Sequence, residues 1–153
     1  MAKGDFLYFN DFADDLGKKV HQLDTDTIKT ALVTNVTVPS VTTAAPSWGA
    51  GGSTNFATNE VSGTNYTAGG IDIAATFSTT GAVGTLDGAT NPAWTQNGAG
   101  PTDIRWGIIY NDTATNKDCI GFIDMGGGSD ISLVDGNISY TFHTDGLGTI
   151  TRT

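Results

Sequence analysis

The sequence predicts a mainly β fold, an antiparallel β-sandwich or jelly roll of about seven or eight strands with one N-terminal helix. Thr and Gly are abundant among the 153 residues, with 21 Gly, whereas nearly all of the 16 acidic residues are Asp rather than the helix-favouring Glu. Short alternating runs of apolar and polar residues recur in the second half of the chain, separated by turn-forming residues. The length suits one domain, which we expect to span residues 1–153.

The helix is expected between about Asn10 and Leu23. Phe12, Leu16 and Val20 recur at helical spacing there, with acidic residues early and lysines late. Asn10 has the side chain of a helix N-cap. The pattern therefore predicts an amphipathic helix that needs the packing of its Phe12 face to persist.

The stretch from residue 36 to 70 is the least regular part of the chain. A β-branched run from Thr27 to Thr34 predicts the first core strand, but the residues after it show neither helical nor strand periodicity. So long an excursion indicates a functional loop or an arm lying on a partner. The alternative is a loop pinned to the domain by Trp48, Phe56 and Tyr66.

The remaining elements are expected to be strands joined by Gly- and Asp-containing turns. One of them is apolar on both faces apart from a single Asp, as expected of a central strand. The expected strands are Ile71 to Phe77, Gly81 to Leu86, Pro92 to Thr95, Ile104 to Tyr110, Cys119 to Met125 (the doubly apolar one), Ile131 to Val134, Asn137 to His143 and Leu147 to Thr153.

Charge excludes two classes of partner. The formal net charge is -9, which repels phosphate backbones and anionic lipid headgroups, so neither nucleic acid nor a membrane surface is an expected partner. No apolar run approaches the length of a membrane span, and the N-terminus does not read as a signal peptide. We therefore expect the chain to stay in a cytoplasm or in a particle assembled there.

The sequence contains no motif that predicts catalysis, a metal or a cofactor. Asp24 and Asp26 have the spacing of a calcium-loop start, but the Gly and Glu that complete such a loop are missing. Asp72 and Asp124 are the only carboxylates within strongly apolar strands, and both are expected to be solvated or bonded to turns rather than to act as a hydrolase acid. Cys119 is interpreted as a small core residue.

Two tryptophans near prolines suggest a binding surface. Trp48 and Trp94 are candidates for exposure in loops, where they would stack on a sugar or pack on a protein partner, whereas Trp106 lies on an alternating face and is expected to be buried.

Several segments resemble a family of small tailed-bacteriophage virion proteins. The resemblance covers most of the chain except residues 36 to 64. It is carried by Phe9 to His21, Asp26 to Leu32, Tyr66 to Gly70, Arg105 to Thr113 and Ile120 to Gly126.

Such proteins are similar to the head decoration, or cement, proteins of phage capsids. The resemblance implies a homotrimer on the outer capsid surface of the virion, bound to the major capsid protein and stabilising its lattice, with no enzymatic activity. Small β-rich virion proteins also occur in tails and baseplates. The alternative is therefore a glycan-binding or adhesive module of a phage head or tail fibre or baseplate.

The residues expected to contact a partner come from the segments that the strand core does not need. These segments are the irregular arm and the N-terminal tip, and their aromatic and proline residues are suited to concentrate binding energy. The candidates are Pro39, Pro46, Trp48, Phe56, Tyr66, Phe6 and Tyr8.

Overall fold

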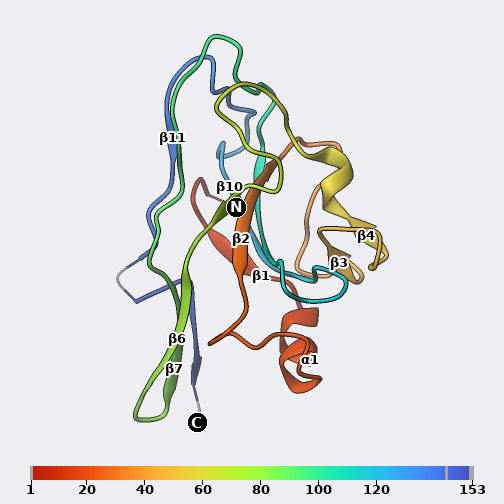
Figure 1. Cartoon of the computed structure of the whole chain (residues 1–153), viewed down its shortest axis with the longest axis vertical. Helices are drawn as coiled ribbons and strands as arrows, with labels where there is room; N and C mark the ends of the chain where they lie inside the picture. The colour runs from red at the N-terminus through yellow and green to blue at the C-terminus, as the bar shows by residue number, and fades with distance from the viewer. Residues whose placement is uncertain (1, 144, 152–153) are drawn as a thin grey trace.

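A five-stranded antiparallel sheet forms the centre of the protein (Figure 1). The computed structural model describes residues 2–143 and 145–151. The sheet has the order β1-β10-β9-β2-β5, in which all neighbours are antiparallel. Its strands are β1 (Phe6–Tyr8), β2 (Ile28–Val33), β5 (Ile71–Asp72), β9 (Trp106–Asn111) and β10 (Cys119–Asp124).

This sheet is covered on both faces. Every residue of β9 and β10 is buried, and so is every residue of β2 except Lys29. Alternation divides their side chains between two core clusters, so that Ile28 and Leu32 lie in one cluster while Ala31 and Val33 lie in the other. The prediction of a central strand with two apolar faces at Cys119 to Met125 is thereby confirmed.

Smaller sheets cover one face, which makes the fold sandwich-like, as predicted. They are a three-stranded antiparallel sheet and a two-stranded pair, and Figure 1 shows β6, β7 and β11 to the left of the central sheet. Leu86, Trp94 and Ile138 from this layer join the core cluster of Ile28 and Leu32. The jelly-roll topology stays a prediction. The strands of this layer are β6 (Ala75–Thr80), β7 (Val83–Gly88), β8 (Ala93–Trp94), β11 (Ile138–Ser139) and β12 (Gly148–Thr151).

The irregular arm covers the opposite face and lies to the right of the sheet in Figure 1. It contains the short parallel pair β3 (Pro46–Ser47) and β4 (Thr54–Asn55), followed by the 3-10 helix η1 (Phe56–Asn59). Backbone hydrogen bonds attach it to the rest of the protein at two places: Trp48 N donates to Lys117 O at 2.8 Å, and Val61 N donates to Leu32 O at 3.1 Å. The arm therefore covers the second face of the central sheet and encloses the core cluster that contains Ala31 and Val33.

The N-terminal helix is shorter than predicted. Helix α1 spans Asp11–Gly17 rather than Asn10 to Leu23, and the Asn10 side chain makes no capping hydrogen bond. Lys19 adopts a left-handed backbone conformation with φ 61°, which ends the helix. The next residues form turns, with Leu23 buried in the core. The apolar spacing thus marked Phe12 and Leu23 correctly as buried, but only Phe12 lies in the helix, and Leu23 lies in a turn after it.

The predicted strand from Ile71 to Phe77 is split into β5 and β6, which belong to different sheets. Ala74 has φ 48°, and its N–H donates to the Asp72 side chain at 2.8 Å. This turn carries the chain from the central sheet to the covering sheet. Alternation continues through the corner because both layers face the same core.

Four other predicted strands are altered. The segment Ile131 to Val134 makes only a single bridge, in which Ile131 pairs with Ile104. Ile104 lies outside β9 and packs in the opposite cluster from Trp106, whereas one continuous strand from Ile104 to Tyr110 would place both side chains on the same face. The segment Asn137 to His143 contains only β11, and the predicted final strand is β12 as far as residue 151, with residues 152–153 outside the described part.

Candidate functional site

The aromatic residues predicted to contact a partner from the arm are instead buried against the central sheet. Trp48 is 6% exposed and stacks on Tyr110 of β9, with ring centroids 4.9 Å apart and an interplanar angle of 14°. Phe56 is fully buried and stacks on Phe9 at 5.9 Å. Pro46 is also buried. The expectation that Trp48 is exposed is therefore wrong, because its side chain fills the core between arm and sheet.

Trp94 is likewise not exposed. It is 3% exposed and lies near Tyr66 and Tyr140 in the core on the other side of the sheet. Trp106 is buried, as predicted. The candidate sugar-stacking surface of Trp48 and Trp94 is thus absent, and the two rings lie in different core clusters.

Two further predicted contact residues have structural roles. Pro39 is buried, and Tyr66 is half-buried. The Tyr66 hydroxyl donates to Glu60 Oε1 at 2.8 Å and accepts from Leu32 N at 3.1 Å, and burial raises its pKa. Gly69 N also donates to Glu60 Oε1, at 2.6 Å. This network fixes the end of the arm to β2.

The N-terminal candidates Phe6 and Tyr8 are half-buried and point to the side of the covering sheets. Tyr8 stacks on Phe12 of α1 at 4.6 Å, and Phe6 contacts Tyr8 edge to face at 4.8 Å. Burial raises the pKa of Tyr8 to about 12. These rings close the sheet edge against the helix, and the structure leaves only part of each ring accessible.

The apolar side chains that the protein does expose are different ones. The large hydrophobic residues exposed in the described part of the chain are Leu7, Val36 and Val38, at 40%, 79% and 59%. Val36 and Val38 stand two residues apart at the start of the arm. We call this pair the valine ridge. Sequence reasoning missed it, although two apolar residues at alternate positions in a polar run were a visible signal.

The residues between and beside the two valines are fixed to the protein. Trp106 Nε1 donates to Asn35 Oδ1 at 3.0 Å, and Asn59 Nδ2 donates to Thr37 Oγ1 at 2.6 Å. Pro39 follows the ridge and is buried. The segment is therefore anchored at alternate residues, and the valine ridge between them faces solvent. Because its backbone is already ordered, the segment loses little conformational entropy when the ridge binds a partner.

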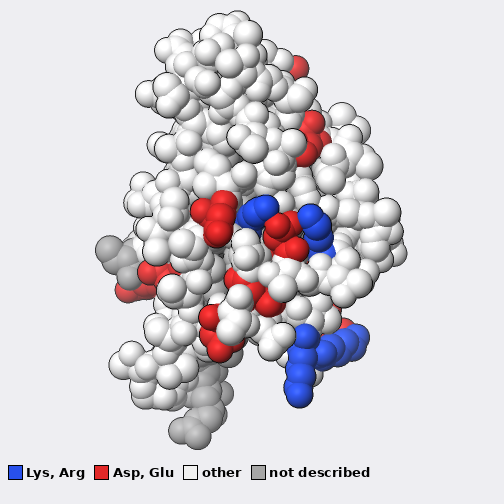
Figure 2. Space-filling model, viewed as in Figure 1, with Lys and Arg blue, Asp and Glu red and all other residues white. Residues whose placement is uncertain are grey.

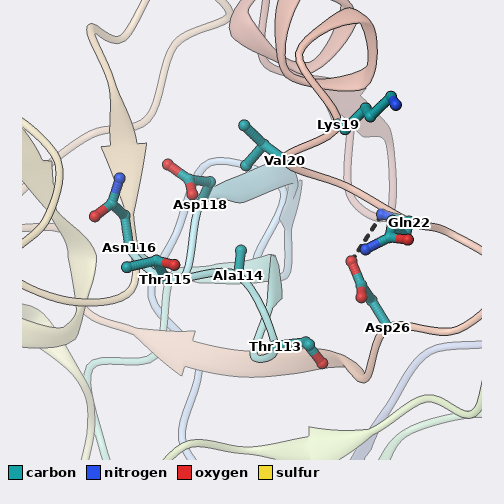
Figure 3. Close-up of a pocket in the computed structure, with 9 residues that line it drawn as sticks. All are labelled: Lys19, Val20, Gln22, Asp26, Thr113, Ala114, Thr115, Asn116 and Asp118. Carbon is teal, nitrogen blue, oxygen red and sulfur yellow. Dashed lines mark hydrogen bonds between the residues drawn. The ribbon is translucent and has the colours of Figure 1, made fainter.

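A polar pocket lies between the turn after α1 and the loop that joins β9 to β10 (Figure 3). Its volume is about 420 Å³. In Figure 3 Asp26 faces Gln22 on one side, and Asp118 and Asn116 lie on the other. The pocket lining contains no aromatic ring that could stack on a sugar. The lining residues are Lys19, Val20, Gln22, Asp26, Thr113, Ala114, Thr115, Asn116 and Asp118.

Behind this pocket lies a buried histidine in a hydrogen-bonded network. The His21 side chain is fully buried, and its Nδ1 lies 3.2 Å from Asn111 Nδ2. The same amide donates to Asp26 Oδ2 at 2.5 Å, and Asp26 accepts from Gln22 N at 2.7 Å. The nearest carboxylate to Nε2 is that of Asp15, 3.8 Å away. The network orders two loops, and it brings no hydroxyl or thiol nucleophile to the histidine.

The two carboxylates considered for hydrolysis are bonded to turns. Asp124 is buried, accepts from the N–H groups of Gly126 and Gly127, and pairs with Arg105 at 3.4 Å. Asp72 is exposed and bonds Ala74 N. Both were predicted to be solvated or turn-bonded, and this is confirmed. Among the described residues, no group of three His, Cys, Asp or Glu side chains could hold a metal ion.

Cys119, the single cysteine, is buried at the start of β10. Its burial raises the pKa of the thiol well above the ordinary value, which disfavours the nucleophilic thiolate. The interpretation of Cys119 as a core residue is confirmed.

Comparison with known proteins gives no guide to function. No family model, no curated protein and no solved structure matches the chain. Within the described residues, no helix is both long and apolar enough to cross a membrane.

Replacing Trp48 by Ala is expected to lower the free energy of unfolding by about 3–5 kcal/mol, the usual loss for a large aromatic side chain removed from a core. Chemical denaturation followed by circular dichroism measures it. Ser53→Ala, an exposed change on the same arm, is the control and should alter stability little. A loss as small as that of the control would contradict the packing of the arm described above.

The buried histidine predicts a pH-dependent stability. Burial is the main cause that lowers the pKa of His21 below 6.5, against the opposing pull of the Asp118 and Asp26 carboxylates. Below its ordinary pKa the unfolded chain binds a proton that the folded chain does not, so the free energy of unfolding should fall as pH decreases from 6.5 towards the lower folded-state pKa. Above pH 6.5 this contribution is constant.

Urea denaturation of the wild type and His21→Asn across this pH range tests the contribution. The Asn amide oxygen offers Asn111 a replacement acceptor, so the wild type should lose more stability on acidification than the variant. Equal losses in the two proteins would show that His21 does not titrate differently on folding.

Proposed function

We propose that this chain is a non-enzymatic structural protein of a bacteriophage virion, a head decoration protein. It binds the outer surface of the capsid as a homotrimer, contacts the major capsid protein and stabilises the lattice. The resemblance of its segments to small phage virion proteins suggests the location, and the properties of the exposed surface support a binding role.

The observation that carries the proposal is the exposed valine ridge. Val36 and Val38 are the most exposed of the large hydrophobic residues in the described part, and their neighbours are anchored to the sheet. Two apolar side chains held rigidly in water favour contact with another protein. A decoration protein needs such a contact, because it stabilises a lattice only by binding the assembled form more tightly than the disassembled one.

Surface charge is compatible with this role. Acidic side chains are spread over the face drawn in Figure 2, where basic side chains occupy only a few positions. The net charge of -9 gives the chain solubility and keeps it away from nucleic acid. These properties suit a protein that coats the outside of a particle filled with DNA.

The glycan-binding alternative has lost the observation that favoured it. It depended on exposed Trp48 and Trp94, and both rings are buried. An adhesive or sugar-binding module would need another aromatic platform, so we propose the decoration role alone.

Val36→Asp and Val38→Asp should weaken binding to shells of the major capsid protein without changing the melting temperature. Burying one valine contributes about 1.5 kcal/mol, so each change should weaken binding about tenfold or more. Co-sedimentation with shells that lack the chain measures this, with Ser53→Asp on the same arm as the charge-matched control.

Cryo-electron microscopy of intact virions locates the chain directly. Density on the outside of the head, with Val36 and Val38 against the major capsid protein, is the expected result. Finding the chain in tail fibres, or absent from particles, would overturn the proposal.

A further inference from the structure

The hairpin of β6 and β7 projects from the molecule at the lower left of Figure 1. Its strands pair from Ala75 opposite Gly88 to Thr80 opposite Val83. The two-residue turn begins with Gly81 at φ 61°, as type II′ hairpins require. Because β12 pairs with the other side of β7, the small sheet has two outer strands, β6 and β12.

The outer side of β6 presents backbone groups without partners. In an antiparallel ladder, hydrogen-bonded pairs alternate with non-bonded ones. The pair Thr80 and Val83 flanks the two-residue turn and is bonded, so the N–H and C=O groups of Phe77 and Thr79 point outward. Within the described residues these groups have no backbone partner. A strand edge in this state is a template for another strand.

This edge also lacks the features that proteins use to prevent such pairing. β6 contains no Pro or charged residue, and the chain has no ionisable side chain between Asp72 and Asp87. The sequence from Gly146 to Thr151, which contains β12, is likewise uncharged. In a chain of net charge -9, the two outer strands of the projecting sheet are thus places where two copies can meet with little repulsion between like charges.

We propose that the free edge of β6 pairs with the outer edge of β12 in a second copy of this chain, and that this contact closes the homotrimer. This inference rests on the homotrimer of the proposed function, and it identifies the two strand edges through which the copies would contact each other. Successive β6 to β12 contacts around a ring use both edges of every copy. A two-fold pairing of β6 with β6 would leave the β12 edges open to further growth.

Light scattering after size-exclusion chromatography of the full chain tests the contact. The wild type should have the mass of three chains, and Thr79→Pro the mass of one. Proline at this position removes an outward N–H and leaves the bonded pairs with β7 in place. Thr79→Asp should also dissociate the ring, and Ser53→Asp, the charge-matched control, should not. Circular dichroism establishes that each variant is folded.

Several outcomes would overturn this inference. They are a monomeric or dimeric wild type, or a folded Thr79→Pro variant that remains a trimer. Thr79→Cys gives a further test, since Cys119 is buried. If β6 pairs with β12, the thiols that this substitution introduces into neighbouring copies lie apart, and oxidation should form no disulfide between copies. Disulfide-linked dimers would instead show that β6 pairs with β6, which contradicts the inference. These measurements use the free chain, whereas binding to capsid shells is measured separately by co-sedimentation. A failure of the β6 to β12 contact can therefore be distinguished from a failure of capsid binding.

Discussion

The stacking of Trp48 on Tyr110 is the contact on which the architecture most depends. It holds an arm without regular periodicity against a sheet whose opposite face is already covered by smaller sheets. Without the arm, one face of β2, β9 and β10 would expose apolar side chains to water. The aromatic residues that look like partner anchors in the sequence are therefore used to complete the domain.

Several acidic residues likewise stabilise the fold. Asp72, Asp124, Asp26 and Glu60 each accept a backbone N–H in a turn or loop. A carboxylate used in this way stabilises a chain reversal and is not poised as a general acid or base. These four carboxylates are therefore used to stabilise turns and loops of the fold.

Much of the fold follows from local pattern. The β-branched run at Thr27 to Thr34 and the doubly apolar run at Cys119 to Met125 predicted β2 and β10 to within a residue at each end. Periodicity predicted the wrong secondary structure where a buried residue lies outside a regular element, as Leu23 does. It also could not reveal the destination of the arm, because the partner of Trp48 lies on a distant strand. The alternating Val36 and Val38 were visible in the sequence, but their exposure depends on which residues the folded arm covers.

Native-state hydrogen exchange tests most directly whether the arm belongs to the core. The informative amides are those of Trp48 and Val61, which donate to Lys117 O and Leu32 O, compared with the amides of β9. An integral arm should exchange at rates similar to those of β9, because both would open only with global unfolding. Fast exchange of Trp48 and Val61 beside a protected β9 would contradict the account, because it would show that the arm detaches while the sheet stays folded.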